Sequence, residues 1–215
     1  MKINTVANQQ NFEGKVIIKN KISVQQNSLF KKHKPNLDKM IEDMPFDLFV
    51  EQSKSKKTIS LSTNVEGAAS YFVRKNEQNF EEAAIRAISD AKDKSPAYKK
   101  LVKANEMLNY TKLGLMYITS GNFKEAREAN KQLAKLAVNN FETYKQATNF
   151  KITNIPPEIG KHLFINSLKY KLYYAFSKKT PEEKQLQKMN KEYLKKLKAN
   201  NEERKPQEIS FPRLY

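Results

Sequence analysis

The side chains best suited to catalysis or metal binding are scarce in this sequence. It contains two histidines, His33 and His162, and no cysteine. The histidines are far apart in the chain, and neither has a second histidine at the spacing that zinc ligands use. Without cysteine there is no disulfide, thiolate ligand or cysteine nucleophile. These residues predict no metal site and no cofactor.

Two pairs of adjacent carboxylates, Glu81-Glu82 and Glu182-Glu183, could in principle act as general acid and base. Both pairs fall in predicted first turns of helices, where the helix dipole already favours negative charge. Five dispersed glycines form no phosphate-binding loop, and no Gly-x-Ser-x-Gly nucleophile elbow is present. We predict that the protein is not an enzyme. The enzymatic alternative needs a pocket that brings His162 beside a carboxylate.

The net charge of +17 is the strongest compositional signal. It comes from 35 lysines and only five arginines, and asparagine is abundant as well. Lysine and asparagine rise together in AT-rich coding sequence, and arginine is the residue that reads guanine and phosphate with two parallel hydrogen bonds. We interpret most of the charge as solvated surface. Lysines could nevertheless hold phosphates without sequence preference.

Neither a membrane span nor a secretory signal is expected. No stretch approaches the roughly 18 uncharged residues that a membrane helix requires. The first ten residues lack the apolar run of a signal peptide. These features predict a cytoplasmic protein.

The first third of the chain reads as strands around one short helix. Residues 58–62 alternate apolar and polar side chains, which is the pattern of a half-buried strand, and residues 48–52 precede them across a polar tip. This pair predicts a hairpin. Residues 15–19 and 70–74 predict two further strands. The short helix is expected after Pro35 and before Pro45.

From Asn79 onward the apolar spacing becomes helical and the helix boundaries are marked clearly. Three capping boxes are predicted, at Asn79/Glu82, Asn122/Glu125 and Thr180/Glu183. Further helices are expected to begin at Ser95-Pro96 and Pro156-Pro157, because proline fits a first helical turn. The helix after Pro157 is apolar over a wide arc, with Tyr170, Tyr173, Tyr174 and Phe176 in its second half, so it is expected at the centre of the core.

These elements predict an α+β fold that is mostly helical. A small antiparallel sheet (about 15–75) precedes about five helices packed as a helical bundle or hairpin array. The predicted division is a sheet region with one short helix (1–78), a helical region (79–200) and a flexible C-terminal tail (201–215). The sequence leaves open one continuous domain, because no Gly/Ser/Pro-rich linker separates the halves.

Residues 110–126 carry a recognisable packing pattern, formed by Tyr110, Leu113, Gly114, Tyr117, Gly121, Phe123 and Ala126. In these residues the chain resembles one helix pair of a tetratricopeptide repeat, and the similarity extends loosely over about 107–137. Such a repeat implies two antiparallel helices and a groove that receives a peptide. The pattern lapses at Asn130 and Leu133, and several repeats are normally stacked. We therefore favour a helix pair that converged on the same packing over a degenerate repeat. Residues 11–16 otherwise resemble the start of uncharacterised small bacterial proteins.

Three surfaces are candidate binding sites. The last helix carries a basic face, formed by Lys184, Lys188, Lys191, Lys195, Lys196 and Lys198. The tail carries apolar residues that could dock in a partner or fold back on the chain, namely Ile209, Phe211, Leu214 and Tyr215. The third surface is the groove of the central helices. We predict a non-enzymatic protein-interaction or scaffold protein that uses its helical face and another protein as partner. The alternative is sequence-nonspecific nucleic-acid binding through the lysine-rich residues 161–205.

Overall fold

The computed structural model describes residues 13–55, 57–74, 79–153, 155, 157–200 and 207–210. The fold is α+β and mostly helical, as predicted, with a small four-stranded sheet before most of the helices. The chain divides into two compact units, and the boundary falls between Leu101 and Val102. Each unit has its own group of buried side chains.

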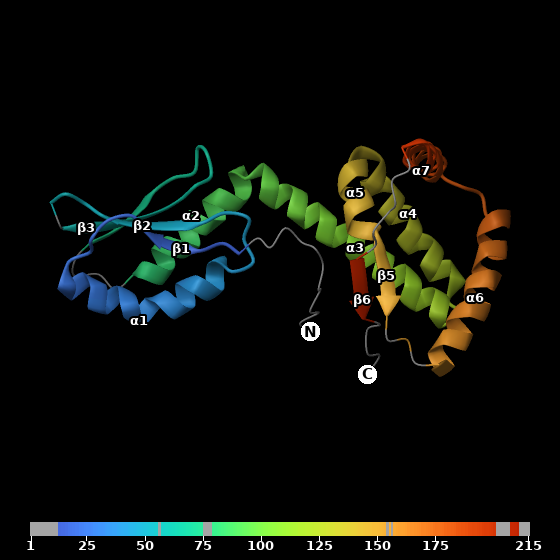
Figure 1. Cartoon of the computed structure of the whole chain (residues 1–215), viewed down its shortest axis with the longest axis horizontal. Coiled ribbons are helices and arrows are strands. Elements are labelled where there is room, and N and C mark those ends of the chain that lie inside the picture. The colour runs from blue at the N-terminus through green and yellow to red at the C-terminus, as the bar shows by residue number, and fades with distance from the viewer. Residues whose placement is uncertain are drawn as a thin grey trace. The chain divides into compact units, whose positions relative to one another are not determined.

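The first unit contains a four-stranded sheet and two helices that cover one face of it (Figure 1). Its elements are β1 (Val16–Ile18), α1 (Val24–Ile41), β2 (Leu48–Gln52), β3 (Thr58–Thr63), β4 (Tyr71–Arg74) and α2 (Phe80–Lys94). The predicted hairpin is confirmed, since Val50 pairs with Leu61 in antiparallel register. Strand β4 extends the sheet in the same antiparallel sense, with Ile59 opposite Val73.

The sheet is mixed rather than antiparallel, because β1 runs parallel to β2 with Ile17 opposite Phe49. A parallel pair needs a crossover connection, and α1 supplies it. The sequence predicted a short helix after Pro35, whereas α1 begins at Val24 and contains Pro35 in its interior. A proline inside a helix removes one backbone hydrogen bond. Burial of Phe30, Leu37 and Ile41 against the sheet offsets that loss.

Strand alternation places the core of this unit between the sheet and the helices. Leu48 and Val50 in β2, Ile59 and Leu61 in β3, and Val73 in β4 are all buried. In β2 and in β3 one residue of the opposite face separates the two buried side chains. They pack against the alanine-rich side of α2, which was expected in the helical region of the chain. The small side chains of α2 let it lie close to the strands, so α2 belongs to the sheet's core.

The second unit is built from helices and one small two-stranded sheet. Its elements are the later part of α3 (Pro96–Thr119), then α4 (Phe123–Asn139), α5 (Phe141–Thr148), β5 (Phe150–Thr153), α6 (Pro157–Phe176), α7 (Pro181–Ala199) and β6 (Gln207–Ser210). Sequence patterns did not indicate α5, β5 or β6. The buried residues of α4, among them Ala126, Ala129 and Ala134, lie on one broad side of the helix, against which α5, α6 and α7 pack. The opposite side, with Glu128 and Lys135, is exposed.

Only one of the three predicted capping boxes forms. Thr180 accepts a hydrogen bond from the Glu183 backbone N–H at 3.3 Å, and Glu183 accepts one from the Thr180 N–H at 2.7 Å. Asn79 and Asn122 make no such bond. Thr180 has the extended backbone (ψ 160°) that aims a capping side chain at the third helical residue, whereas Asn79 (ψ 35°) and Asn122 (ψ 72°) do not.

Candidate docking surfaces

The residues of the predicted helix pair lie on α3, on α4 and in the turn that joins them. Gly114 and Ala126 are buried, whereas Leu113 is 38% exposed. A Cβ added to Gly114 would meet the Asn130 Oδ1 atom at 3.6 Å, an ordinary contact, so the approach of the helices does not require glycine there. Gly121 does need glycine, because its φ is +78°. Glycine is therefore required in the turn at Gly121, whereas the contact between the helices at Gly114 would accept alanine.

The remaining residues of that pattern, Tyr110, Tyr117 and Phe123, are partly buried. The Phe123 ring packs against α6 and not against a neighbouring repeat. Its centroid lies 5.9 Å from that of Tyr170 and 6.0 Å from that of Tyr173. Sequence reasoning missed this partnership, because nothing in the local spacing indicates which distant helix fills the gap beside a turn.

The inner face of α6 is fixed by polar contacts. Asn166 donates a hydrogen bond from Nδ2 to the Thr119 carbonyl at 2.8 Å, and Asn130 donates one to the Tyr170 hydroxyl at 2.5 Å. Tyr170 is the buried residue of α6, and this burial raises the pKa of its hydroxyl despite the opposing effect of Asn130. The two contacts set the rotation of α6 about its own axis.

That rotation leaves an apolar stripe on the outer face of α6. We call this stripe the α6 face, and it consists of Phe164, Ile165, Leu168, Leu172 and Phe176. Phe176 is 89% exposed, Phe164 67% and Leu172 63%. The prediction that this helix lies at the centre of the core is therefore wrong for half of its circumference. Hydrophobic spacing shows how wide an apolar arc is, but it does not show whether the same chain supplies a partner for it.

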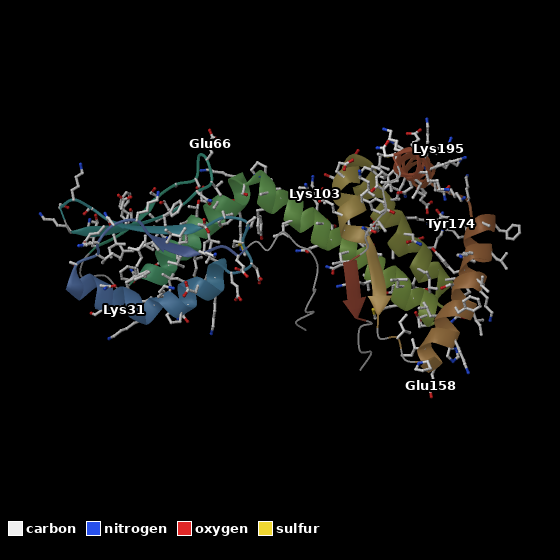
Figure 2. The ribbon with its side chains drawn as sticks, viewed as in Figure 1. Lys31, Glu66, Lys103, Glu158, Tyr174 and Lys195 are labelled. Atoms are coloured by element: carbon white, nitrogen blue, oxygen red, sulfur yellow. The ribbon has the colours of Figure 1, made fainter. Side chains whose placement is uncertain are left out.

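Lysines border the α6 face. Lys161, Lys169 and Lys171 are exposed, and helical geometry places Lys169 and Lys171 along opposite edges of the stripe. Glu158, labelled in Figure 2 at the start of α6, is the acidic residue of this helix. The arrangement is an apolar strip between positive borders.

A buried ion pair holds α7 against α4. Arg127 donates a hydrogen bond to the Glu183 carboxylate, and both side chains are less than 5% exposed. The Arg127 guanidinium also donates to the Lys178 carbonyl at 2.7 Å and lies 5.1 Å from the ring centroid of Tyr174, which Figure 2 labels on α6. Three segments of the second unit therefore meet at one guanidinium.

The predicted basic face of α7 is exposed. Lys184, Lys188, Lys191, Lys195 and Lys198 recur every three or four residues and so share one side of the helix, with Lys196 beside them. Figure 2 shows Lys195 projecting away from α7. Among the described residues no carboxylate forms an ion pair with any of these lysines. The opposite side of α7 packs through Leu186 against Ala134 and Ala137.

The C-terminal tail contributes a strand to its own chain. Residues 207–210 form β6, which pairs in parallel with β5 and places Ile209 opposite Ile152. The predicted flexible tail (201–215) thus contains one strand that the sequence patterns did not indicate. Phe211, Leu214 and Tyr215, the other predicted docking residues, lie outside the described part of the chain.

The two histidines occupy different environments. His33 is half-buried in α1, with Nδ1 3.1 Å from the Glu81 Oε1 atom and its ring stacked on Phe80. His162 is exposed on α6. Asn36 donates a hydrogen bond to Glu81 at 2.8 Å, and this bond and the His33 contact lower the pKa of the Glu81 carboxyl. Glu81 therefore joins α1 to α2.

The described residues contain no group of three or more histidine or acidic side chains placed to hold a metal ion. Every helix in these ranges is too short or too polar to cross a bilayer.

Comparison of the chain with protein-family models, with curated proteins and with solved structures finds no match. The likeness to a tetratricopeptide helix pair therefore stays a prediction that rests on seven residues.

Proposed function

We propose that this is a non-enzymatic interaction protein whose α6 face binds an amphipathic helix of another protein. One observation carries the proposal: α6 exposes Phe164, Leu172 and Phe176 on the side away from its packing contacts. Large exposed apolar patches that are bordered by polar residues mark interaction sites. An amphipathic helix laid along a stripe of this spacing would bury it.

The charges around the stripe favour a partner whose helix carries carboxylates on its borders. Lys169 and Lys171 would face those carboxylates across the rim of the interface, where complementary charge increases the association rate. A second copy of this chain fits less well. If two α6 helices met through the stripe, lysine would face lysine along both edges.

The experiment uses two designed amphipathic peptides of about five helical turns. They share one leucine stripe and differ in having glutamate or lysine at the border positions. In fluorescence anisotropy the glutamate peptide should bind the full chain about tenfold more tightly than the lysine peptide. The Leu168→Gln variant should lose this binding. Leu194→Gln is the matched control, since Leu194 on α7 is 48% exposed and Leu168 is 47% exposed.

Equal binding of the two peptides, or equal loss in the two variants, would contradict the proposal. Sedimentation velocity of the full chain tests whether a second copy of the chain binds the α6 face instead. A dimer that Leu168→Gln dissolves would assign the α6 face to self-association instead.

The alternative function is sequence-nonspecific nucleic-acid binding within residues 161–205. The unpaired lysines of α7 favour it, because lysines held on one side of a helix can release several phosphate counterions at once. Gel shifts with random duplex DNA at about 50 and 200 mM salt test it, with a steep loss of affinity expected at the higher salt. The Lys188→Glu/Lys195→Glu variant should weaken the shift. No shift at low salt would remove this alternative.

A further inference from the structure

The outer face of the four-stranded sheet, opposite α1 and α2, carries two phenylalanines. Phe72 in β4 is 66% exposed, and Phe49 in β2 is half-buried. Sheet faces that meet water normally carry polar side chains, as Ser60 and Ser62 do here on the intervening strand β3. Leaving an aromatic ring in water forgoes the stabilisation that burying it would give. The exposure of Phe72 therefore needs an explanation outside the packing of this unit.

The strand register fixes how the rings are placed. Phe72 lies opposite Ser60, and Ser60 lies opposite Glu51 on β2. Phe49 is two residues before Glu51 on that strand, so the two rings are separated by the width of two strand spacings and by two residues along the strand. Strand spacing and rise put the two Cα atoms about 12 Å apart. Successive bases stacked in a duplex strand are only about 3.4 Å apart. Two neighbouring bases could reach both rings only from a strand whose bases are splayed apart.

An open depression of about 470 Å³ adjoins Phe72 on this face. Lys21 and Lys54 contribute amines to its lining, and Thr58 and Ser60 contribute hydroxyls. Glu51 is the carboxylate among the lining residues. Near Phe49, the Lys19 Nζ atom lies 3.9 Å from the ring centroid. Each of the two rings therefore has lysine amines near it on this face.

We infer that this outer face binds single-stranded RNA. The exposed Phe72 ring offers a platform on which an unpaired base stacks, and the lysines, including Lys19 over Phe49, offer the positive charge that follows a phosphate backbone. The Thr58 and Ser60 hydroxyls can exchange hydrogen bonds with the 2′-hydroxyl that distinguishes RNA from DNA. Glu51 would repel a phosphate, but it can accept a hydrogen bond from the amino group of cytosine. The assignment is independent of the α6 face.

The probe is a fluorescein-labelled oligocytidylate of about 12 nucleotides, titrated with the full chain at about 50 mM salt. Phe72→Ala should weaken binding about tenfold, which is the loss of one stacked base. Its matched control is Ile85→Ala, because Ile85 is an exposed apolar residue (55%) of the same unit on α2, in the helical layer. That control and Leu168→Gln on the α6 face should bind as the unchanged protein does.

Further variants separate the contributions of charge and base recognition. Lys21→Ala/Lys54→Ala should weaken binding and reduce its salt dependence. Glu51→Ala should reduce the preference for oligocytidylate over oligouridylate. Circular dichroism of each variant confirms that the sheet is folded.

Several results would overturn the assignment. They are absence of binding at low salt, a Phe72→Ala variant that binds as tightly as Ile85→Ala, and oligothymidylate that competes as well as the RNA. Loss of binding in the Lys188→Glu/Lys195→Glu variant with none in Phe72→Ala would place RNA on α7 instead.

Discussion

Arg127 of α4 and Glu183 of α7 form an ion pair in which both side chains are buried. Each of the two charged groups has a second hydrogen-bond partner. Arg127 also donates to the Lys178 carbonyl, and Glu183 also accepts from the Thr180 backbone N–H. A buried charge is stable only when such additional hydrogen bonds replace water. The pair therefore couples the start of α7 to α4 through four polar groups.

Breaking this pair should be costly. Arg127→Ala leaves the Glu183 carboxylate buried without its main partner, and the expected loss in the free energy of unfolding is about 3–5 kcal/mol. The double variant Arg127→Met/Glu183→Leu should lose less than Arg127→Ala or Glu183→Ala alone, because it removes both charges and keeps the volume. Urea unfolding followed by far-ultraviolet circular dichroism measures both. Additive losses in the double variant would contradict the coupling.

The cap of α7 gives a second prediction. Thr180→Ala should destabilise the protein by about 1 kcal/mol, because it removes the hydrogen bond to the Glu183 backbone N–H. Thr180→Ser keeps the hydroxyl and should be close to neutral. Asn79→Ala, at the predicted cap of α2 that makes no side-chain bond, should cost less than Thr180→Ala. Equal midpoints of urea unfolding for Thr180→Ala and Asn79→Ala would show that the side-chain hydrogen bond of the α7 cap does not stabilise the protein.

Two glycines of one helix pair should respond in opposite ways to alanine. Gly121→Ala forces a side chain into a left-handed backbone (φ +78°) and should cost about 1–2 kcal/mol. Gly114→Ala meets only the Asn130 Oδ1 atom at contact distance and improves helix propensity, so it should be neutral or stabilising by up to about 1 kcal/mol. The thermal unfolding midpoints of the two variants, compared with that of the unchanged protein, test this prediction. A strongly destabilised Gly114→Ala would mean that α3 and α4 do require glycine at their contact.

Asp90 should make the first unit sensitive to acid. Its carboxylate accepts a hydrogen bond from the Ala69 backbone N–H at 2.6 Å and pairs with Lys94, and these contacts lower its pKa. Because the folded pKa is depressed, the stabilisation is fully present above the ordinary value of 3.8 and is lost as the pH falls through the folded pKa. Between about pH 5 and pH 2, Asp90→Asn should therefore lose less stability than the unchanged protein. Identical pH profiles of urea unfolding would refute this role.

Local signals in the sequence were enough to locate most of the elements. The alternation in residues 58–62 identified β3, and the polar tip before it identified the hairpin partner β2. Ser95-Pro96 marked the start of α3, and Thr180-Pro181 marked the start of α7. These signals succeed because turn chemistry and first-turn proline act within a few residues. The long helix α1 was missed at its start, since packing against the sheet overrides the cost of Pro35.

The sequence by itself determined the α+β class, the hairpin, the boundaries of several helices and the lysines that line α7. Only the tertiary structure decided that β1 runs parallel to β2, that α2 joins the sheet's core, and that Phe164 and Phe72 face water. The physical reason is that periodicity fixes which side chains share a face of an element. Whether that face is covered depends on segments far away in the chain, and Arg127 and Glu183, which lie 56 positions apart, meet only in the folded protein.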